Sequence, residues 1–271
     1  LDGIQHHAAQ SGAPEPARAL LRLGDGVCQP SEGASTRWEN TDYRQRLDSC
    51  TAARVFFISP GDSRIELTLN DSLRREFEVE GAAAVRQVTV TAPHIRSLAF
   101  KVNSGTEGFI GYGAVFEADG VVVDNYSVRS NNGQAMFWTN PSVNAQINAH
   151  AGYDLVILQY GLNILEPGIR SFAKYGEQIE KMIAYIRQCF PTAAVLVMSV
   201  SDRSVKSDSG FVPMDSAPYM AAAQRQAAQT AGQPSGAPTT PCNRSAAWRN
   251  SWPTAGPERT TPTSISRAVV A

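Results

Sequence analysis

The residue with the clearest chemical setting in this sequence is Asn163, which follows a short apolar stretch and a glycine. Residues 154–160 read Asp-Leu-Val-Ile-Leu-Gln-Tyr, and this pattern predicts a buried strand of a parallel sheet. In open α/β sheets the functional crevice lies beyond the carboxyl ends of the strands. Gly161 lets the backbone turn there, so the Asn163 amide could donate to a developing oxyanion. Gly-x-Asn is also ordinary turn chemistry, and both interpretations stay open at this point.

The residues on either side of this stretch predict the elements that would position Asn163. Residues 120–125 and 193–200 are short apolar stretches that indicate strands. Between them, residues 169–190 carry apolar side chains at steps of three and four, which indicates a helix with one apolar face. The strand at 154–160, the helix at 169–190 and the strand at 193–200 follow one another and make a βαβ unit with a right-handed crossover. We therefore predict an α/β domain over residues 119–232.

Residues 53–118 carry a different pattern. Residues 76–80 and 97–102 alternate strictly between apolar and polar side chains, which indicates strands with one face in water. Turn residues such as Pro60-Gly61-Asp62 separate these stretches. Several short strands at this spacing predict an antiparallel β-sandwich of the jelly-roll type. Such a domain commonly binds carbohydrate or braces its neighbour.

The two ends of the chain are less regular than its middle. Residues 1–52 are dominated by Gly, Ala, Ser and polar residues, so we expect a poorly defined N-terminal segment there. Residues 233–267 are rich in Pro, Thr, Ser, Gly and Arg and have almost no branched apolar residues. Such a composition does not bury a core. We therefore predict that residues 233–271 form an irregular or disordered tail.

The composition excludes several classes of function. Of the 271 residues, 42% are hydrophobic, which is enough to bury a sizeable core. The formal net charge of -1 gives no basic surface for nucleic acid, so we expect no nucleic-acid partner. No stretch approaches the ~18 apolar residues of a membrane helix, so we expect no membrane span. The cysteines show no metal-binding spacing, and we expect no metal or other cofactor.

Three stretches together resemble the SGNH (GDSL-like) hydrolases. They are the strand that ends in Gly161-Leu-Asn163, the strand and loop at 123–133, and residues 195–204. The order of these elements carries the resemblance more than any single motif does. The most similar relatives are bacterial enzymes that attach a β-sandwich and remove O-acetyl groups from peptidoglycan or other polysaccharides. The resemblance covers about residues 54–231 and implies a flavodoxin-like, SGNH-type parallel sheet with helices on both faces.

The chemistry of that family is acyl transfer by a serine nucleophile, with a histidine base, an orienting aspartate and an oxyanion hole. On this resemblance, Asn163 matches the asparagine of the oxyanion hole. The loop glycine of the family corresponds to either Ser130 or Gly133, and both alignments stay open. Ser130 in that position would still offer its backbone N–H. The candidate catalytic residues are therefore Asn163, Gly133 and Ser130.

The nucleophile and the base of the family are harder to match. Gly61-Asp62-Ser63 spells the family's Gly-Asp-Ser motif, but its surroundings favour a hairpin turn inside the sandwich. Gly24-Asp25-Gly26 lies nearer the expected place and has glycine where the serine belongs. The family's Asp-x-x-His motif belongs in the C-terminal part, whereas the histidines of this chain are His6, His7, His94 and His150. Ser63 remains a candidate nucleophile without an evident base.

These observations lead to two functional expectations. The first is an exported esterase that removes O-acetyl groups from cell-wall or other polysaccharide by serine acyl transfer. The alternative is a non-catalytic carbohydrate-binding protein that uses the β-sandwich. The expected partner in both cases is a polysaccharide or peptidoglycan. We also expect the chain to be an incomplete homologue, truncated or replaced at one or both ends, and for that reason possessing an incomplete catalytic site.

Overall fold

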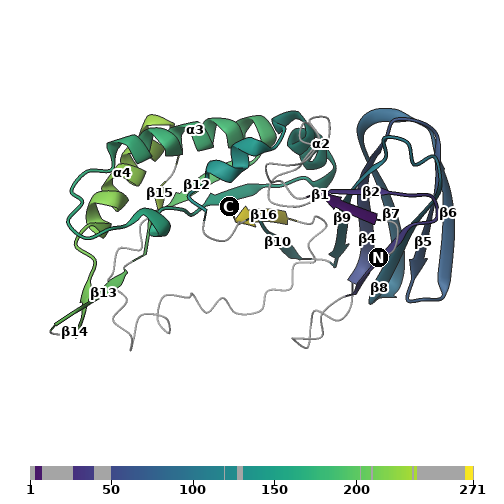
Figure 1. Cartoon of the computed structure of the whole chain (residues 1–271), viewed down its shortest axis with the longest axis horizontal. Coiled ribbons are helices and arrows are strands. Elements are labelled where there is room, and N and C mark those ends of the chain that lie inside the picture. The colour runs from purple at the N-terminus through teal and green to yellow at the C-terminus, as the bar shows by residue number, and fades with distance from the viewer. Residues whose placement is uncertain are drawn as a thin grey trace, which may run out of the picture. The chain divides into compact units, whose positions relative to one another are not determined.

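The computed structural model describes residues 4–7, 27–39, 50–118, 120–126, 131–201, 203–208, 210–233, 235–236 and 266–270. These residues belong to two compact units, whose elements are labelled in Figure 1. The first unit comprises residues 1–120 and 138–152, and the second comprises residues 121–137 and 153–271. Each unit has its own sheet system, and each is described by itself.

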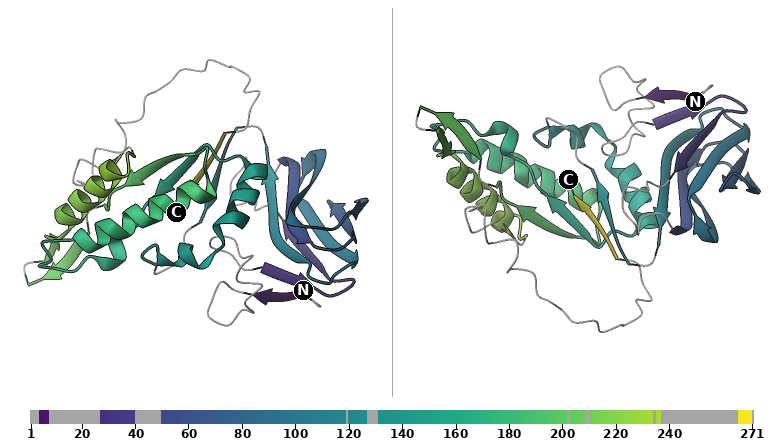
Figure 2. Two further views of the ribbon diagram at one scale, coloured as in Figure 1. Left: turned by 90° about the horizontal axis from the view of Figure 1, so that it is seen from above. Right: turned by 90° about the horizontal axis from the view of Figure 1, so that it is seen from below.

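The first unit is a sandwich-like pair of antiparallel sheets (Figure 2). One sheet has the strand order β1-β2-β9-β4-β7. Its strands are β1 Ile4–His7, β2 Val27–Pro30, β4 Cys50–Ser59, β7 Ala82–Ile95 and β9 Ile110–Glu117. The other sheet has the order β3-β8-β5-β6, with β3 Ser35–Glu39, β5 Ser63–Leu69, β6 Leu73–Val79 and β8 Ser97–Ser104. The alternating stretches of the sequence therefore form a strand-rich, sandwich-like unit.

Strand β4 buries both of its faces. Successive side chains of a strand point to opposite faces, and here both sets are apolar. Phe57 belongs to the core between the sheets, where its ring stacks on that of Phe109 with 5.2 Å between centroids. Phe56 and Ile58 belong to a second apolar cluster on the other face. A continuous apolar run such as 55–58 therefore serves two cores at once.

Helix α2, Pro141–Ala151, provides the second cluster with its cover. Val143 and Ile147 lie one helical turn apart and pack in the cluster of Phe56 and Ile58. The helix begins at the N-cap Asn140, whose side chain accepts a hydrogen bond from the Ser142 N–H. Residues 141–151 fall in the range 119–232 predicted as the α/β domain, whereas the structure groups this helix with the first unit, where its apolar face packs on β4.

The second unit is built on a five-stranded sheet with the order β10-β16-β11-β12-β15. Every pairing that the structure describes in this sheet is parallel. The strands are β10 Val121–Asn125, β11 Leu155–Leu158, β12 Ala194–Met198, β15 Ser235–Gly236 and β16 Ser266–Val270. Strands β11 and β12 pair from Leu155 with Ala194 to Leu158 with Val197. The stretch before Gly161 is thus an inner strand of a parallel sheet.

Strands β15 and β16 lie within residues 233–271, where an irregular tail was expected, and residues 237–265 of that segment lie outside the described residues. The backbone of β16 lies between β10 and β11, with Ala268 paired to both Val123 and Leu155. The last residues of this strand in the sequence are Ala-Val-Val, which suits a strand with neighbours on both sides. The composition of the whole segment is dominated by the Pro, Thr and Ser residues before this short apolar stretch, so composition alone did not indicate a strand.

The second unit also contains two long helices, α3 Ala173–Cys189 and α4 Ala217–Thr230, and an antiparallel strand pair, β13 Ser204–Ser207 with β14 Gly210–Pro213. The two helices approach closely, since a Cβ on Gly176 would lie 3.6 Å from the carbonyl oxygen of Ala223. Helix α3 begins later than the expected residue 169 because Asp215 holds the preceding segment as a loop, accepting from the Gly168 N–H and pairing with Arg170. No helix in the described ranges is long and apolar enough to cross a membrane.

Two leucines of neighbouring strands give a test of the sandwich core. Leu67 of β5 is 0% exposed, whereas Leu73 of β6 is 43% exposed. We expect Leu67→Ala to lower the free energy of unfolding by about 2–5 kcal/mol, because it removes buried methyl groups and leaves a cavity. Leu73→Ala should change it by only about 0.5 kcal/mol. Equilibrium urea denaturation of both variants checks this, and equal effects would contradict the assigned core.

Candidate functional site

The turn after β11 packs closely against Val200 and Gln224, and this leaves no space for a side chain at Gly161. The residue has φ +114°, and a Cβ there would lie 2.8 Å from Cγ1 of Val200 and 3.0 Å from Nε2 of Gln224. The chain then enters the 3-10 helix η2, Leu162–Ile164, in which the Ile164 N–H donates to the Gly161 carbonyl. Asn163 is the middle residue of η2. The turn therefore has one available path, and that path sets the position of Asn163.

The Asn163 side chain reaches the loop that follows β10. Its Nδ2 donates to the carbonyl oxygen of Asn131 over 2.8 Å. In that loop, Oδ1 of Asn131 accepts from the Gly133 N–H at 2.6 Å. Asn163 and Gly133 are thus joined through a single residue, Asn131. The structure places two of the three predicted site residues in one hydrogen-bonded chain, and the third, Ser130, lies outside the described residues.

The loop is fixed from α3 as well. The Tyr175 hydroxyl donates to the Asn132 carbonyl at 3.0 Å, and Nε2 of Gln178 donates to the same oxygen at 3.2 Å. Gly133 has φ +96°, and a Cβ there would lie 2.1 Å from Sδ of Met182. Two helix side chains and one close approach therefore define the loop. The sequence indicated the apolar face of α3 but not the polar contacts made by Tyr175 and Gln178.

The chemistry open to this arrangement depends on which N–H groups of Asn163 and Gly133 already donate hydrogen bonds. A primary amide has two N–H donors, and within the described residues the Asn163 amide uses one of them, on Asn131. Among the described residues the other N–H has no hydrogen-bond partner, and it could donate to the oxygen of a ligand. Gly133 has a single backbone N–H, and that hydrogen is taken by the Asn131 side chain. Asn163 is therefore the donor available in this arrangement, while Gly133 could donate to a ligand only after releasing Asn131.

A second brace comes from residues after β12. Nη1 of Arg203 donates to the carbonyl oxygens of Leu162 and Leu165, at 2.9 and 3.2 Å. The guanidinium thus closes the far side of the turn that carries Asn163. Arg203 and the preceding Asp202 follow the apolar stretch at 193–200, and no sequence pattern indicated which groups Arg203 contacts. Asp202 itself lies outside the described residues.

Buried tyrosines surround the loop. Burial raises the pKa of Tyr175 well above its ordinary value, and the neighbouring Tyr160 contributes in the same direction. Burial also raises the pKa of Tyr160. Both phenols are therefore neutral donors near pH 7, which suits the hydrogen bond from Tyr175 to a carbonyl oxygen. They provide structure and do not supply a base.

Ser63 lies in the first unit, at the start of β5. Its Oγ is 2.8 Å from Oγ of Ser59, and the neighbouring Asp62 accepts a hydrogen bond from the Gly81 N–H. The expected hairpin turn is wrong, because β4 and β5 belong to different sheets, and Asp62 and Ser63 lie where the chain passes from one sheet to the other. The histidines belong to this unit too, and His150 ends α2 with its Nε2 3.0 Å from the Val85 carbonyl oxygen. The sequence of the second unit contains no histidine.

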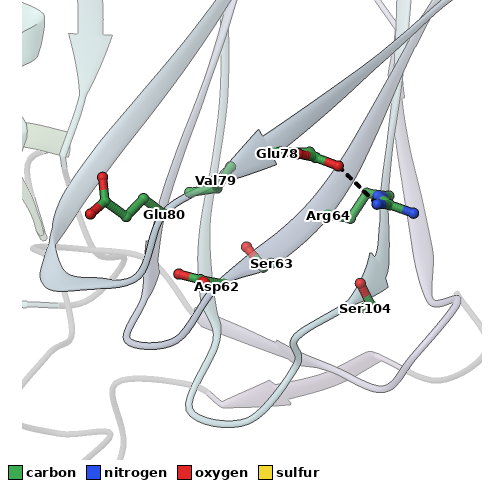
Figure 3. Close-up of a pocket in the computed structure, with 7 residues that line it drawn as sticks. All are labelled: Asp62, Ser63, Arg64, Glu78, Val79, Glu80 and Ser104. Atoms are coloured by element: carbon green, nitrogen blue, oxygen red, sulfur yellow. Dashed lines mark hydrogen bonds and ion pairs between the residues drawn. The ribbon is translucent and has the colours of Figure 1, made fainter.

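The residues around Ser63 line a pocket of about 420 Å³ at one end of the β5–β6 pair (Figure 3). Arg64 and Glu78 form an ion pair across its wall at 2.8 Å. The lining is polar and consists of Asp62, Ser63, Arg64, Glu78, Val79, Glu80 and Ser104. Carboxylates and hydroxyls can exchange hydrogen bonds with sugar hydroxyls. These residues come from three strand ends, so no local sequence signal marked them as one site.

Among the residues that the structure describes, no three His, Cys, Asp or Glu side chains are grouped so that they could hold a metal ion.

Comparison with known proteins gives a fold similarity without a sequence match. No protein-family model matches the chain, and neither does any curated protein. A solved structure of a peptidoglycan O-acetylesterase superposes with a TM-score of 0.59 at 16% sequence identity, over 88% of this chain and 65% of that chain. This chain therefore spans less than two thirds of that protein. The similarity shows the fold alone.

Two further solved structures align less closely. A carbohydrate-binding protein named CsCBM6-3, from Clostridium stercorarium in complex with cellobiose, gives a TM-score of 0.29 at 15% identity over 44% of this chain and 85% of that chain. A family two carbohydrate esterase from Clostridium thermocellum, in complex with cellohexaose, gives 0.28 at 10% identity over 98% of this chain and 88% of that chain. Scores at this level carry no argument about function.

The close approach at Gly161 can be separated from its left-handed conformation by a pair of variants. Gly168 also has a positive φ, +81°, but a Cβ there would meet nothing within 4 Å. We expect Gly168→Ala to destabilise by about 1–2 kcal/mol, from the backbone conformation alone. Gly161→Ala should cost about 2–5 kcal/mol, because overpacking against Val200 is added. Urea denaturation measures both, and equal costs would show that the turn is not packed as described.

Tyr175 predicts a pH dependence of stability. Its folded-state pKa is raised above the ordinary value of 10.0, so its contribution is fully present below about pH 10 and is lost as the pH rises through the folded pKa. We expect Tyr175→Phe to cost about 1 kcal/mol at pH 7, through loss of the hydrogen bond to Asn132, and to reduce the alkaline loss of stability. Denaturation at pH 7 and pH 11 tests this. Tyr219→Phe, at an exposed tyrosine, is the control, and an equal change in the two variants would contradict the assignment.

Proposed function

We propose that this chain is an SGNH-type carbohydrate esterase that removes O-acetyl groups from polysaccharide or peptidoglycan by serine acyl transfer, and that it acts outside the cytoplasm. The observation that carries the proposal is the Asn163 amide, held at the carboxyl end of β11 with one N–H directed to Asn131. A hydrogen-bond donor at this edge of a parallel sheet is placed where it could stabilise a developing oxyanion. The fold similarity to a peptidoglycan O-acetylesterase is in agreement.

In this proposal the second unit carries the flavodoxin-like, SGNH-type sheet, and Asn163 stabilises the oxyanion as a serine attacks the acetyl carbonyl. A fixed amide donor accelerates this step because it does not have to reorganise as charge develops. The second donor would be the backbone N–H of Ser130, or that of Gly133 once its hydrogen leaves Oδ1 of Asn131. The sandwich of the first unit would hold the polysaccharide chain.

A second candidate function is carbohydrate binding without catalysis. Two observations favour it: the sequence of the second unit has no histidine to act as base, and the first unit has a polar pocket of about 420 Å³. In that case the pocket of Asp62, Glu78 and their neighbours would accept sugar hydroxyls. The second unit would then serve as a scaffold.

Acetate release from O-acetylated peptidoglycan tests the esterase directly. We expect Asn163→Ala to lower kcat by about 10²- to 10³-fold, as expected for loss of an oxyanion donor, with the protein still folded. The matched control is Asn103→Ala, at a half-buried asparagine of β8 in the first unit, which should leave kcat unchanged. Equal activity in wild type and Asn163→Ala would refute the role of Asn163.

The same preparation distinguishes the second candidate. Saturable binding of the polysaccharide without release of acetate would support carbohydrate binding and exclude the esterase. Glu78→Gln, which replaces one carboxylate of the pocket, should weaken that binding, whereas Glu32→Gln at an exposed site should not.

A further inference from the structure

The hydrogen-bond ladder between β11 and β12 ends just before the candidate site. The last backbone pair is Leu158 with Val197, and beyond it the two chains diverge into their turns. Gln224 of α4 spans this gap. Its Nε2 donates to the carbonyl oxygen of Tyr160 at 2.7 Å, and its Oε1 accepts from the N–H of Val200 at 2.8 Å. The side-chain amide thus continues the ladder by one step after the backbones have separated.

Gln224 is a polar residue on the buried, otherwise apolar face of α4. The side chain is 1% exposed and shares its face of α4 with Met220, Ala227 and Ala228, which are apolar and equally buried. Burying a polar amide is unfavourable unless both its donor and its acceptor are satisfied, and here both are. An apolar side chain would meet the packing requirement of the face. The amide is needed only for the two backbone groups beyond the strand ends.

Tyr160, which Gln224 contacts, precedes Asn163 by only three residues, so the position of one affects the position of the other. The Gln224 amide is also close to Gly161, since a Cβ added to Gly161 would lie 3.0 Å from Nε2 of Gln224. From Gly161 onward the 3-10 turn η2 fixes the path of the chain, so a shift of the Tyr160 carbonyl would carry Asn163 with it. Arg203 braces the same turn from an exposed position. Gln224 is the buried anchor.

We infer that Gln224 is a positioning residue for the candidate oxyanion donor: it ties the turn after β11 to the end of β12 and thereby aims the Asn163 amide. This inference rests on the proposed function for its catalytic consequence, but its structural content concerns Asn163 alone. Gln224 touches no reacting atom. Its effect would appear in the orientation of Asn163 and in the catalytic rate, and not in the affinity for substrate.

The test uses the full chain with three variants. Gln224→Leu keeps the approximate volume and removes both hydrogen bonds. Gln226→Leu changes an exposed glutamine on the same helix and is the matched control. Gln224→Glu offers a donor and an acceptor when it is protonated but only acceptors when it is ionised. The side-chain amide signals of asparagines labelled with ¹⁵N report Asn163 directly, and those of Asn144, bonded to Thr139 in the first unit, are an internal reference.

We expect Gln224→Leu to shift or broaden the Asn163 side-chain signals while those of Asn144 stay in place, and Gln226→Leu to change neither. Where acetate release is measurable, kcat should fall about 10- to 100-fold with KM unchanged, as expected for a displaced catalytic group. Gln224→Glu should resemble wild type at acidic pH and Gln224→Leu after ionisation, which also decides the question if the leucine variant does not fold.

Unchanged Asn163 signals in folded Gln224→Leu, or in ionised Gln224→Glu, would overturn the positioning role. If the wild-type protein releases no acetate, the proposed esterase activity is wrong. The Asn163 signals would still show whether Gln224 positions the turn. The two failures are therefore distinguishable.

Discussion

The close packing at Gly161 is the constraint on which the candidate site depends. The glycine admits the chain between Val200 and Gln224, with no room for a Cβ, and a 3-10 turn then carries Asn163 to the loop after β10. A larger residue would push the turn away from the sheet and break the bond to Asn131. Hydrogen bonds from Tyr175 and Gln178 hold the loop after β10, and a hydrogen bond from Arg203 holds the turn after β11.

The first unit follows a different principle, in which one strand supplies two cores. Strand β4 presents Phe57 to the space between the sheets and Phe56 to α2. Arg54 of the same strand pairs with the buried Glu117 of β9 at 2.6 Å and donates to the His150 carbonyl at the end of α2. Breaking such a buried pair by removing one partner is costly, because the other charge is left without compensation. The helix and the sheet are therefore linked by charge as well as by apolar contact.

Local patterns in the sequence predicted the elements whose character does not depend on distant partners. The apolar stretches before Gly161 and at 193–200 form β11 and β12, and the three-and-four spacing of α3 places Ile179, Met182 and Ile183 in the core. The parallel arrangement also explains why two loops distant in sequence, around Gly133 and Asn163, could be expected at one edge of a sheet.

Other features could not be predicted because tertiary contacts decide them. Helix α2 has weak amphipathic character in sequence, and only the apolar face of β4 shows where it belongs. Strand β16 is five residues within a Pro- and Thr-rich segment, and its neighbours β10 and β11 make it a strand. In the sequence Gln224 is one polar residue of an alanine-rich stretch, and nothing local indicates that it bridges two strand ends. The use of the Gly133 N–H by Asn131 is equally a matter of side-chain geometry.

Labelling of the folded protein with a fluorophosphonate probe, followed by peptide mass spectrometry, tests the proposed serine acyl transfer. The probe reacts with an activated serine and leaves ordinary serines largely untouched. We expect a label on one serine, and identification of that residue would complete the site around Asn163. Absence of label on folded protein would contradict the esterase and leave carbohydrate binding by the first unit as the function to pursue.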